Sequence, residues 1–504
     1  MNIWQVSREM SPLAEAGGIK DVVYGLSRAL VSLGHEVTVV LPMYRFLEDK
    51  SYCDPLVSFP LRGRKGDEQI SLYPCYVEGI RVLLVKAAVF LSKDRVYTYS
   101  MREEGLRADF QYGKGHLDAN EMNLTLQYAA LEGAMALGEL PEVFHLHDGH
   151  CGFLPAIMRT KKRYSGYFSR SGTLLTIHNG GAVYQQNIED FHEVEKLTGL
   201  SHSVLKSFHT PMGWNPLLCA GLYGKINTVS ERYAEDVMSG KDINSGLIGE
   251  LFHSAGIELI GITNGIDPDH HDRCSHSPVL KNGTHNSFTE KKRECRALLI
   301  KRIADLEKSG YLYGAMIDDD RPLFTLQSRI AYQKGIDVLA DFLERYASDL
   351  DARFLVLGEG DRDLEARLAG IAGRIGNFAY FRYYDPSLSA DVFAGGDFFL
   401  VPSQWEPCGL TDFIAQLNGN IPIVHETGGL VKTKDRLNGF SYSPNTPERL
   451  AEKVREAIYL YGNDREILHQ IRKNAVNIIN EKYTWRQVLD ERYIPLYRSI
   501  TGRA

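Results

Sequence analysis

Short apolar segments rich in β-branched and aromatic residues recur along the chain, and each is followed by a glycine-containing or polar turn and a helical pattern. Strands that are apolar throughout are buried on both faces, so this alternation predicts parallel sheets covered by helices. In the first half we expect strands at residues 2–6, 36–42, 81–87, 143–148, 173–179, 225–230 and 259–265. In the second half we expect strands at residues 323–329, 353–360, 378–384, 397–402 and 421–426. These are too many strands for one sheet, so the chain is predicted to form two doubly wound, Rossmann-like α/β domains.

Helical patterns and one polar segment set the expected domain boundaries. The expected helices are residues 121–137 in the first half and 335–348, 362–372, 409–418, 447–461 and 464–480 in the second. Residues 268–287 are polar, rich in histidine and without a hydrophobic period, so they are predicted to form a linker before a charged helix at 289–308. The expected division is residues 1–267 for the first domain, 268–320 for the linker and lead-in helix, and 321–485 for the second domain.

Composition and charge exclude several classes of protein. The net charge of −7 over 504 residues argues against a nucleic-acid-binding surface or a basic membrane-binding face. The seven cysteines include no CxxC pair, which is typical of a reduced, intracellular protein. The first strand begins at once, so no secretory signal is expected, and no apolar run approaches the ~18 residues of a membrane span. We therefore expect a cytoplasmic protein with no membrane or nucleic-acid partner.

The segment SPLAEAGGIKDVVYGL, residues 11–26, follows the first expected strand and opens an amphipathic helical pattern. A glycine pair between a strand and a helix presents backbone N–H groups to a phosphate, so Gly17 and Gly18 are candidate binding residues. Glu15 stands two residues before Gly17, where a negative charge opposes the binding of an anion.

Two cations follow the first expected strand of the second domain. In SRIAYQKG, residues 328–335, Arg329 closes the strand and Lys334 lies just before a glycine and the next helix. Arginine offers a planar fork and lysine a point charge, so the two side chains suit a diphosphate. A surface arginine and lysine near a turn are the alternative, and the spacing alone does not decide between them.

A second polar loop, SQWEPCGLTDF at residues 403–413, follows a later strand of the same domain. Gly409 opens a helix whose free N–H groups, together with Thr411, suit a phosphate. Glu406 lies at the tip of the loop, where its carboxylate suits vicinal hydroxyl groups. The alternatives are an exposed turn acid for Glu406 and a small buried apolar side chain for Cys408.

The segment HLHDGH, residues 145–150, invites a metal-binding interpretation. Its spacing departs from that of the metallo-β-lactamase-like hydrolases, because Asp148 directly follows His147 and Gly149 precedes His150. A strand also sends His147 and Asp148 to opposite faces. We therefore expect no metal site and interpret these residues as polar side chains at a strand end.

These segments together resemble the bacterial glycogen synthases and plant starch synthases, which are retaining glycosyltransferases with the two-Rossmann (GT-B) fold. The resemblance runs in order along nearly the whole chain and rests on SPLAEAGGIKDV, HLHDGHCGFLP, LLTIHN, AGLYGKINTVSERYA, GITNGID, SRIAYQKGIDVL, DFFLVPSQWEPCGL and IVHETGGL. It implies two domains facing each other across a cleft. It also implies that residues 486–504 form a helix that joins the first domain, because the apolar positions 488, 494 and 496 need a partner surface.

The resemblance implies roles for individual residues. Arg329 and Lys334 would neutralise the leaving diphosphate of a nucleotide-glucose, and Glu406 would hold the 3- and 4-hydroxyls of the glucose. His178 would lie under the transferred sugar, and Asp148 would stand on the acceptor side. The donor-binding residues implied by the family's motifs are Gly17, Gly18, Asn264, Tyr384 (stacked on adenine), Cys408, Gly409, Leu410 and Thr411.

The chain departs from the family pattern at several positions. Glu15 replaces a lysine that touches the donor, and Lys20, where the family has a small residue, is expected to pair with Glu15 or to reach the phosphates. Gly149 replaces a tryptophan and is expected to loosen the acceptor side. Asp412 replaces a glutamine, and Lys432 replaces an acid. These changes leave the donor nucleotide, the acceptor length and the level of activity open.

The function implied is that of a glycogen synthase, which transfers glucose from ADP-glucose to the non-reducing end of an α-1,4-glucan with retention. No metal or other cofactor is expected, since fixed cations can stabilise the leaving diphosphate. The alternatives are a related retaining glycosyltransferase with another nucleotide-sugar or acceptor, and a glucan-binding homologue without turnover. The oligomeric state and any regulation are not legible in the sequence.

Overall fold

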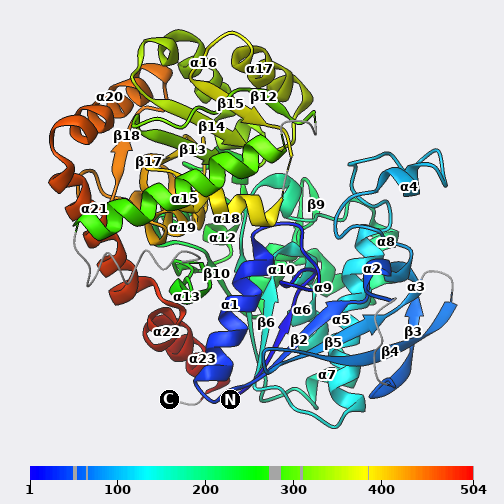
Figure 1. Cartoon of the computed structure of the whole chain (residues 1–504). Helices are drawn as coiled ribbons and strands as arrows, with labels where there is room; N and C mark the ends of the chain where they lie inside the picture. The colour runs from blue at the N-terminus through cyan, green and yellow to red at the C-terminus, as the bar shows by residue number, and fades with distance from the viewer. Residues whose placement is uncertain (49–53, 64–65, 272–284, 307–309, 384, 503–504) are drawn as a thin grey trace. The chain divides into compact units, whose positions relative to one another are not determined.

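The computed structural model describes residues 1–48, 54–63, 66–271, 285–306, 310–383 and 385–502. The chain separates into two compact units, the first formed by Met1–Gly265 with Trp485–Ala504 and the second by Ile266–Thr484. Both ends of the chain therefore belong to the first unit (Figure 1). The segment expected to lead into the second sheet forms helix α15 (His285–Asp305), which packs against α18 (Pro386–Gly395) within the second unit.

The described part of the first unit contains a nine-stranded sheet in the order β11-β10-β7-β6-β1-β2-β5-β4-β3. The strands are β1 (Asn2–Val6), β2 (Glu36–Pro42), β3 (Val57–Gly63), β4 (Gly66–Val77), β5 (Ile80–Lys86), β6 (Val143–His147), β7 (Gly172–Ile177), β10 (Lys225–Thr228) and β11 (Leu259–Gly261). All neighbours pair in parallel except β3, β4 and β5, which form an antiparallel extension at one edge. The sequence analysis missed β3 and β4, because their exposed and buried residues alternate and a charged pair of residues separates them in the sequence.

The second unit contains, in its described residues, a seven-stranded sheet in the order β12-β15-β14-β13-β16-β17-β18. The strands are β12 (Leu312–Gly314), β13 (Leu323–Gln327), β14 (Arg353–Leu357), β15 (Phe378–Phe381), β16 (Phe398–Val401), β17 (Ile421–His425) and β18 (Phe440–Tyr442). All pairs are parallel except β12 with β15. The two strands that sequence analysis missed here, β12 and β18, are short edge strands.

Each sheet has one point at which the strand order reverses. In the first sheet the chain runs outward from β1 through β2 to β5 and then restarts at β6 on the other side of β1. In the second sheet it runs from β13 through β14 to β15 and restarts at β16. Ligands of open α/β sheets bind beyond the carboxyl ends of the strands at such switch points. The segments that follow β1, β6, β13 and β16 are therefore the places to look for a site.

The helices that cover the sheets follow the apolar periodicity of the sequence. They include α1 (Ile19–Ser32), α5 (Ala119–Ala136), α16 (Ile336–Tyr346), α17 (Arg362–Ala372), α19 (Thr411–Leu417), α20 (Pro447–Asn463) and α21 (Arg465–Ile478). Helix α19 begins two residues later than expected, because Gly409 has a left-handed backbone (φ +77°) that cannot belong to an α-helix. No helix in the described ranges combines the length and the apolar character needed to cross a bilayer.

The C-terminal segment packs on the first sheet. It consists of α22 (Trp485–Val488), a π-helical stretch (Leu489–Tyr493) and α23 (Ile494–Thr501). The hydroxyl of Tyr497 lies 2.7 Å from Nδ1 of His145 in β6. A Cβ atom added at Gly25 or Gly265 would lie 2.2 Å or 2.6 Å from the indole of Trp485. The indole therefore fills the space that these two glycines leave open.

Candidate active site

The glycine loop that follows β1 is shaped by a buried carboxylate. Glu9 is 1% exposed and accepts hydrogen bonds from the backbone N–H of Gly17 (2.6 Å) and Ala16 (3.1 Å) and from the hydroxyl of Tyr97 (2.7 Å). Burial raises the pKa of Glu9 above its ordinary value. A Cβ atom at Gly18, in contrast, would meet nothing within 4 Å, so the outer face of the loop is open. Sequence analysis found the two glycines but missed Glu9.

The negative charge of Glu15 in this loop lies close to a positively charged side chain. Oε1 of Glu15 lies 3.5 Å from Nζ of Lys20 and accepts a hydrogen bond from the hydroxyl of Ser11 at 2.6 Å. Lys20 is shared with Asp21, whose carboxylate lies 2.8 Å away. The expected pairing of Glu15 with Lys20 is therefore present. The carboxylate of Glu15 is 42% exposed, so the pair contributes at most about 1 kcal/mol to stability.

Asp148 and His178 lie together at the carboxyl ends of β6 and β7. Asp148 is 1% exposed, has a left-handed backbone (φ +57°) and accepts a hydrogen bond from the backbone N–H of His178 at 2.6 Å. Burial raises the pKa of Asp148 to about 8 and lowers the pKa of His178 to about 3. At neutral pH the first unit therefore presents an uncharged carboxyl group beside an uncharged imidazole.

His145 and His147 of HLHDGH are held by buried hydrogen-bonding partners within the first unit. The ring nitrogens of His145 lie 2.7 Å from the hydroxyls of Tyr497 and Thr176. Those of His147 lie 3.0 Å from Nε2 of His178 and 3.0 Å from Oε1 of Gln5. Across the described part of the chain, no three His, Cys, Asp or Glu side chains are grouped so that they could hold a metal ion.

Gly149 is a place of close packing, which contradicts the expectation that it loosens the acceptor side. A Cβ atom at this position would lie 2.4 Å from the carbonyl oxygen of Gln185. The side chain of Gln185 is buried, and its amide nitrogen donates to the carbonyls of Gly180 and Ser245, both at 2.9 Å. The segment around Gln185 therefore occupies the space into which a larger side chain at position 149 would project.

Replacing Gly149 by alanine is expected to lower the free energy of unfolding by about 1–3 kcal/mol, because a fixed backbone oxygen must move to admit the methyl group. The measurement is the urea midpoint of the first unit's unfolding transition. Gly18→Ala is the matched control, since the space around Gly18 is open, and we expect a change within about 0.5 kcal/mol. Equal midpoints for the two variants would contradict the packing argument.

In the second unit, the loops after β13 and β16 meet at the switch point of the sheet. Lys334 ends a 3-10 turn (Tyr332–Lys334), and its Nζ lies 2.5 Å from Oε2 of Glu406. A Cβ atom at Gly335 (φ +66°) would lie only 1.7 Å from the carbonyl oxygen of Pro402, so the QKG segment requires glycine for this approach. Arg329 is exposed at the end of β13 and donates to Oε1 of Gln333 at 3.1 Å. The structure therefore places Lys334 in contact with Glu406. Arg329, which precedes Lys334 by a few residues in the chain, lies on the surface.

The loop after β16 continues into unpaired backbone donors. Glu406 also accepts a hydrogen bond from the hydroxyl of Ser403 at 3.2 Å. Within the residues that the structure describes, the backbone N–H groups of Gly409, Leu410 and Thr411 donate to no protein acceptor. Cys408 is buried at 6% exposure, so it packs as a small apolar side chain. The second unit therefore brings a cation from the loop after β13 into contact with a carboxylate of the loop after β16, and free N–H groups follow that carboxylate in the chain.

Two further expected donor-binding residues are Asn264, in the first unit, and Tyr384. Asn264 follows β11 in the first unit and is 2% exposed, and its buried Oδ1 has no hydrogen-bond partner among the residues that the structure describes. An unpaired buried acceptor of this kind is costly unless a ligand or water satisfies it. Tyr384 lies outside the described residues.

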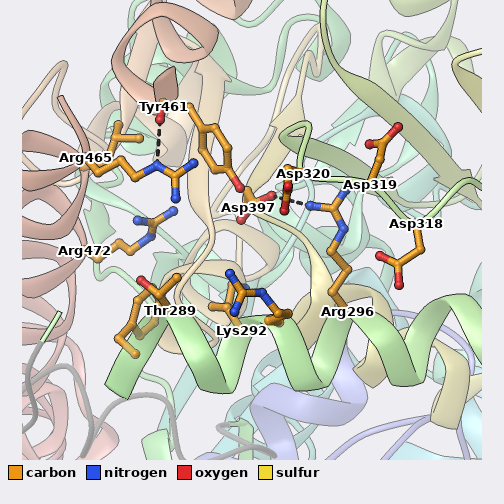
Figure 2. A pocket seen from close by; sticks show the side chains of 13 residues that line it. Thr289, Lys292, Arg296, Asp318, Asp319, Asp320, Asp397, Tyr461, Arg465 and Arg472 are labelled. Atoms are coloured by element: carbon orange, nitrogen blue, oxygen red, sulfur yellow. Dashed lines mark hydrogen bonds and ion pairs between the residues drawn. The ribbon is translucent and has the colours of Figure 1, made fainter. Parts of the chain in front are cut away.

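A pocket of about 420 Å³ in the second unit lies away from these loops (Figure 2). Arg296 and Asp397 line it as an ion pair at 3.3 Å, and Nε of Arg465 donates to the carbonyl of Tyr461 at 2.9 Å. Asp397 also accepts from the backbone N–H of Leu323, the first residue of β13. The pocket is therefore at the amino ends of the strands, whereas Lys334 and Glu406 follow the carboxyl ends.

Two Rossmann-like units with polar residues at both switch points define a glycosyltransferase of the GT-B class, and two family models match the chain accordingly. Residues 2–251 match "Starch synthase catalytic domain" and residues 321–459 match "Glycosyl transferases group 1". A glycogen synthase from Geotalea daltonii is 30% identical over 92% of each chain. The chain belongs to the family of bacterial glycogen synthases and plant starch synthases.

Other relatives cover the whole chain. A glycogen synthase from Exiguobacterium sibiricum is 29% identical over the full length of both chains, and one from Vibrio cholerae is 26% identical over 99% of this chain and 98% of its own. The catalytic domain of starch synthase IV from Arabidopsis thaliana, solved with ADP and acarbose, superposes with a TM-score of 0.81 at 24% identity, covering 100% and 99% of the two chains. These matches confirm the predicted fold class.

Proposed function

We propose that this glycosyltransferase is a glycogen synthase that transfers glucose from ADP-glucose to the non-reducing end of an α-1,4-glucan with retention. The observation that carries the proposal is the contact of Lys334 with Glu406, 2.5 Å apart at the switch point of the second sheet. A cation for phosphate and a carboxylate for sugar hydroxyls are thereby adjacent, as a nucleotide-sugar requires. The relatives named as glycogen synthases and the ADP in the starch synthase IV structure support this choice.

The chemistry follows from where charge develops. As the bond between the anomeric carbon and the diphosphate breaks, negative charge grows on a β-phosphate oxygen. Lys334, Arg329 and the free N–H groups that begin at Gly409 stabilise that charge. The glucan 4-hydroxyl attacks from the same face, forms the new glycosidic bond and passes its proton to the departing diphosphate. Because protein cations offset the charge, we expect turnover without added metal.

The first unit is assigned the acceptor and the transferred sugar. Asp148 keeps its proton at neutral pH, so its carboxyl group is able to donate a hydrogen bond to a sugar hydroxyl. The neutral imidazole of His178 offers a donor and an acceptor without adding positive charge. Neither group is needed as a nucleophile, and a glycosyl-enzyme trapped on Asp148 or Glu406 would contradict this route.

The family carries a lysine at the position of Glu15 in the glycine loop. This change of charge favours a second candidate function, in which the enzyme uses a donor other than ADP-glucose. The deciding assay incubates the purified protein with glycogen, EDTA and ADP-, UDP- or GDP-glucose, and it measures the released nucleoside diphosphate. We expect ADP release from ADP-glucose in the presence of the chelator. Preferential use of another donor, activity that EDTA abolishes, or glycogen binding without turnover would each overturn the proposal.

A further inference from the structure

A buried lysine connects the loops that carry the second unit's candidate donor site. Nζ of Lys432 donates hydrogen bonds to the carbonyl oxygens of Cys408 (2.6 Å), Gly409 (2.7 Å) and Gly429 (3.1 Å). It also forms an ion pair with Oδ2 of Asp412 at 2.9 Å. The lysine side chain is 6% exposed and the aspartate side chain is fully buried. An ammonium group has three protons to donate, so its hydrogen-bonding capacity is fully used inside the protein.

Both partners of this pair occupy positions where the chain departs from the family pattern. Position 412 carries an acid in place of a glutamine, and position 432 carries a base in place of an acid. The structure shows that the two changed residues, Asp412 and Lys432, contact each other. Together they place one buried ion pair next to the candidate donor site. An acid at position 432 has no proton to offer the carbonyls of Cys408 and Gly409, so in this chain these carbonyls are held in a different way.

Holding those carbonyls also fixes the direction of the neighbouring N–H groups. In a trans peptide the C=O and N–H bonds point to opposite sides of one rigid plane. The carbonyl of Cys408 shares its plane with the N–H of Gly409, and the carbonyl of Gly409 shares its plane with the N–H of Leu410. Because Lys432 binds both oxygens, both N–H groups point away from it, and neither has a protein acceptor in the described part of the chain.

We propose that Lys432 is a positioning residue for the donor's diphosphate: it fixes the peptides at Cys408 and Gly409 so that two N–H groups meet the phosphate oxygens. This inference rests on the proposed function, since it takes a nucleoside diphosphate as the ligand of this loop. Asp412 keeps Lys432 in place and offsets its charge. The hydroxyl of Thr433 donates to the same carboxylate oxygen at 3.0 Å, which fixes Asp412 in turn.

The experiment compares the binding of ADP and AMP by calorimetry to the full-length protein. The test variant is Lys432→Met with Asp412→Asn, which removes both buried charges together and preserves side-chain length. We expect its Kd for ADP to rise at least about tenfold, the loss expected for one hydrogen bond to a charged group. The Kd for AMP, which lacks the β-phosphate, is expected to change less than about threefold, so the ratio of the two Kd values shifts.

Lys301→Met is the control, because it removes an exposed lysine of α15 that lies outside this contact, and we expect both Kd values to stay within about threefold of wild type. If the double variant does not fold, Lys432→Gln with Asp412→Asn replaces it. An equal loss of ADP and AMP binding would mean a merely structural lysine, and unchanged Kd values for both nucleotides would mean no role; either overturns the inference. The proposed function is tested separately, by whether the wild-type protein binds ADP at all.

Discussion

Replacing Lys334 by methionine lowers the turnover number for glucosyl transfer by about 10²- to 10³-fold, the loss typical of one oriented group that stabilises developing negative charge. Methionine matches the lysine side chain as far as Cε and lacks the ammonium group. The effect is expected in kcat as well as in KM, because the charge on the β-phosphate grows as the glycosidic bond breaks. The measurement is steady-state release of ADP from ADP-glucose with glycogen as acceptor.

Two further variants separate catalysis from general effects of charge. Lys301 is exposed on α15, and Lys301→Met removes a lysine outside the candidate site, so its kinetics should match those of wild type. In Lys334→Met the carboxylate of Glu406 is left without its cation. Adding Glu406→Gln removes the charge of that carboxylate, and it tests whether the unpaired charge causes the loss of turnover. A loss below about fivefold in Lys334→Met would mean that the contact with Glu406 only holds the two loops together.

The largest effect on stability is expected for Lys432→Met alone. The variant leaves Asp412, whose side chain is fully buried, without its cation, and breaking a buried pair in this way costs about 3–5 kcal/mol. Burial already raises the pKa of Asp412, and the ammonium of Lys432 opposes that shift. Without Lys432 that opposition is lost, so we expect the pKa of Asp412 to rise further. The measurement is the thermal or urea unfolding of the second unit.

Adding Asp412→Asn to Lys432→Met should recover most of that loss, because a neutral amide is far cheaper to bury than a lone carboxylate. The stability of Lys432→Met should also improve at acid pH, where Asp412 is protonated, while that of the double variant should not show this trend. A single variant as stable as wild type at pH 8 would show that the pair carries little net energy.

The parallel strands and their helices were predictable because they are encoded locally. Strands such as β1 and β2 are continuous apolar runs between turns, and sequence analysis placed both with their observed bounds. The antiparallel hairpin of β3 and β4 was not predictable in the same way, since half of its residues face solvent. The left-handed conformation of Gly409, which delays the start of α19, depends on contacts that no local pattern records.

The candidate site was predictable only in part. Lys334 and Glu406 follow separate strands, and the rule for switch points was enough to expect them on one edge of the sheet. The role of Glu9 depends on a fold-back of the loop onto a buried carboxylate, and the contact of Lys432 with Asp412 joins the end of a 3-10 turn to the first turn of α19. Gly149 was misjudged because a missing side chain suggests space, whereas here a backbone segment occupies that space.

The way the chain leaves and re-enters the first unit has a practical consequence. The second unit begins at Ile266 and ends at Thr484, and the two residues form a parallel β-bridge, with the N–H of Ile266 donating to the carbonyl of Tyr483 at 2.8 Å. The second unit is thus an insertion whose own ends adjoin. It is suited to excision and separate expression, whereas the first unit buries Trp485, Tyr493 and Tyr497 of the C-terminal segment, so removal of that segment is expected to destabilise it.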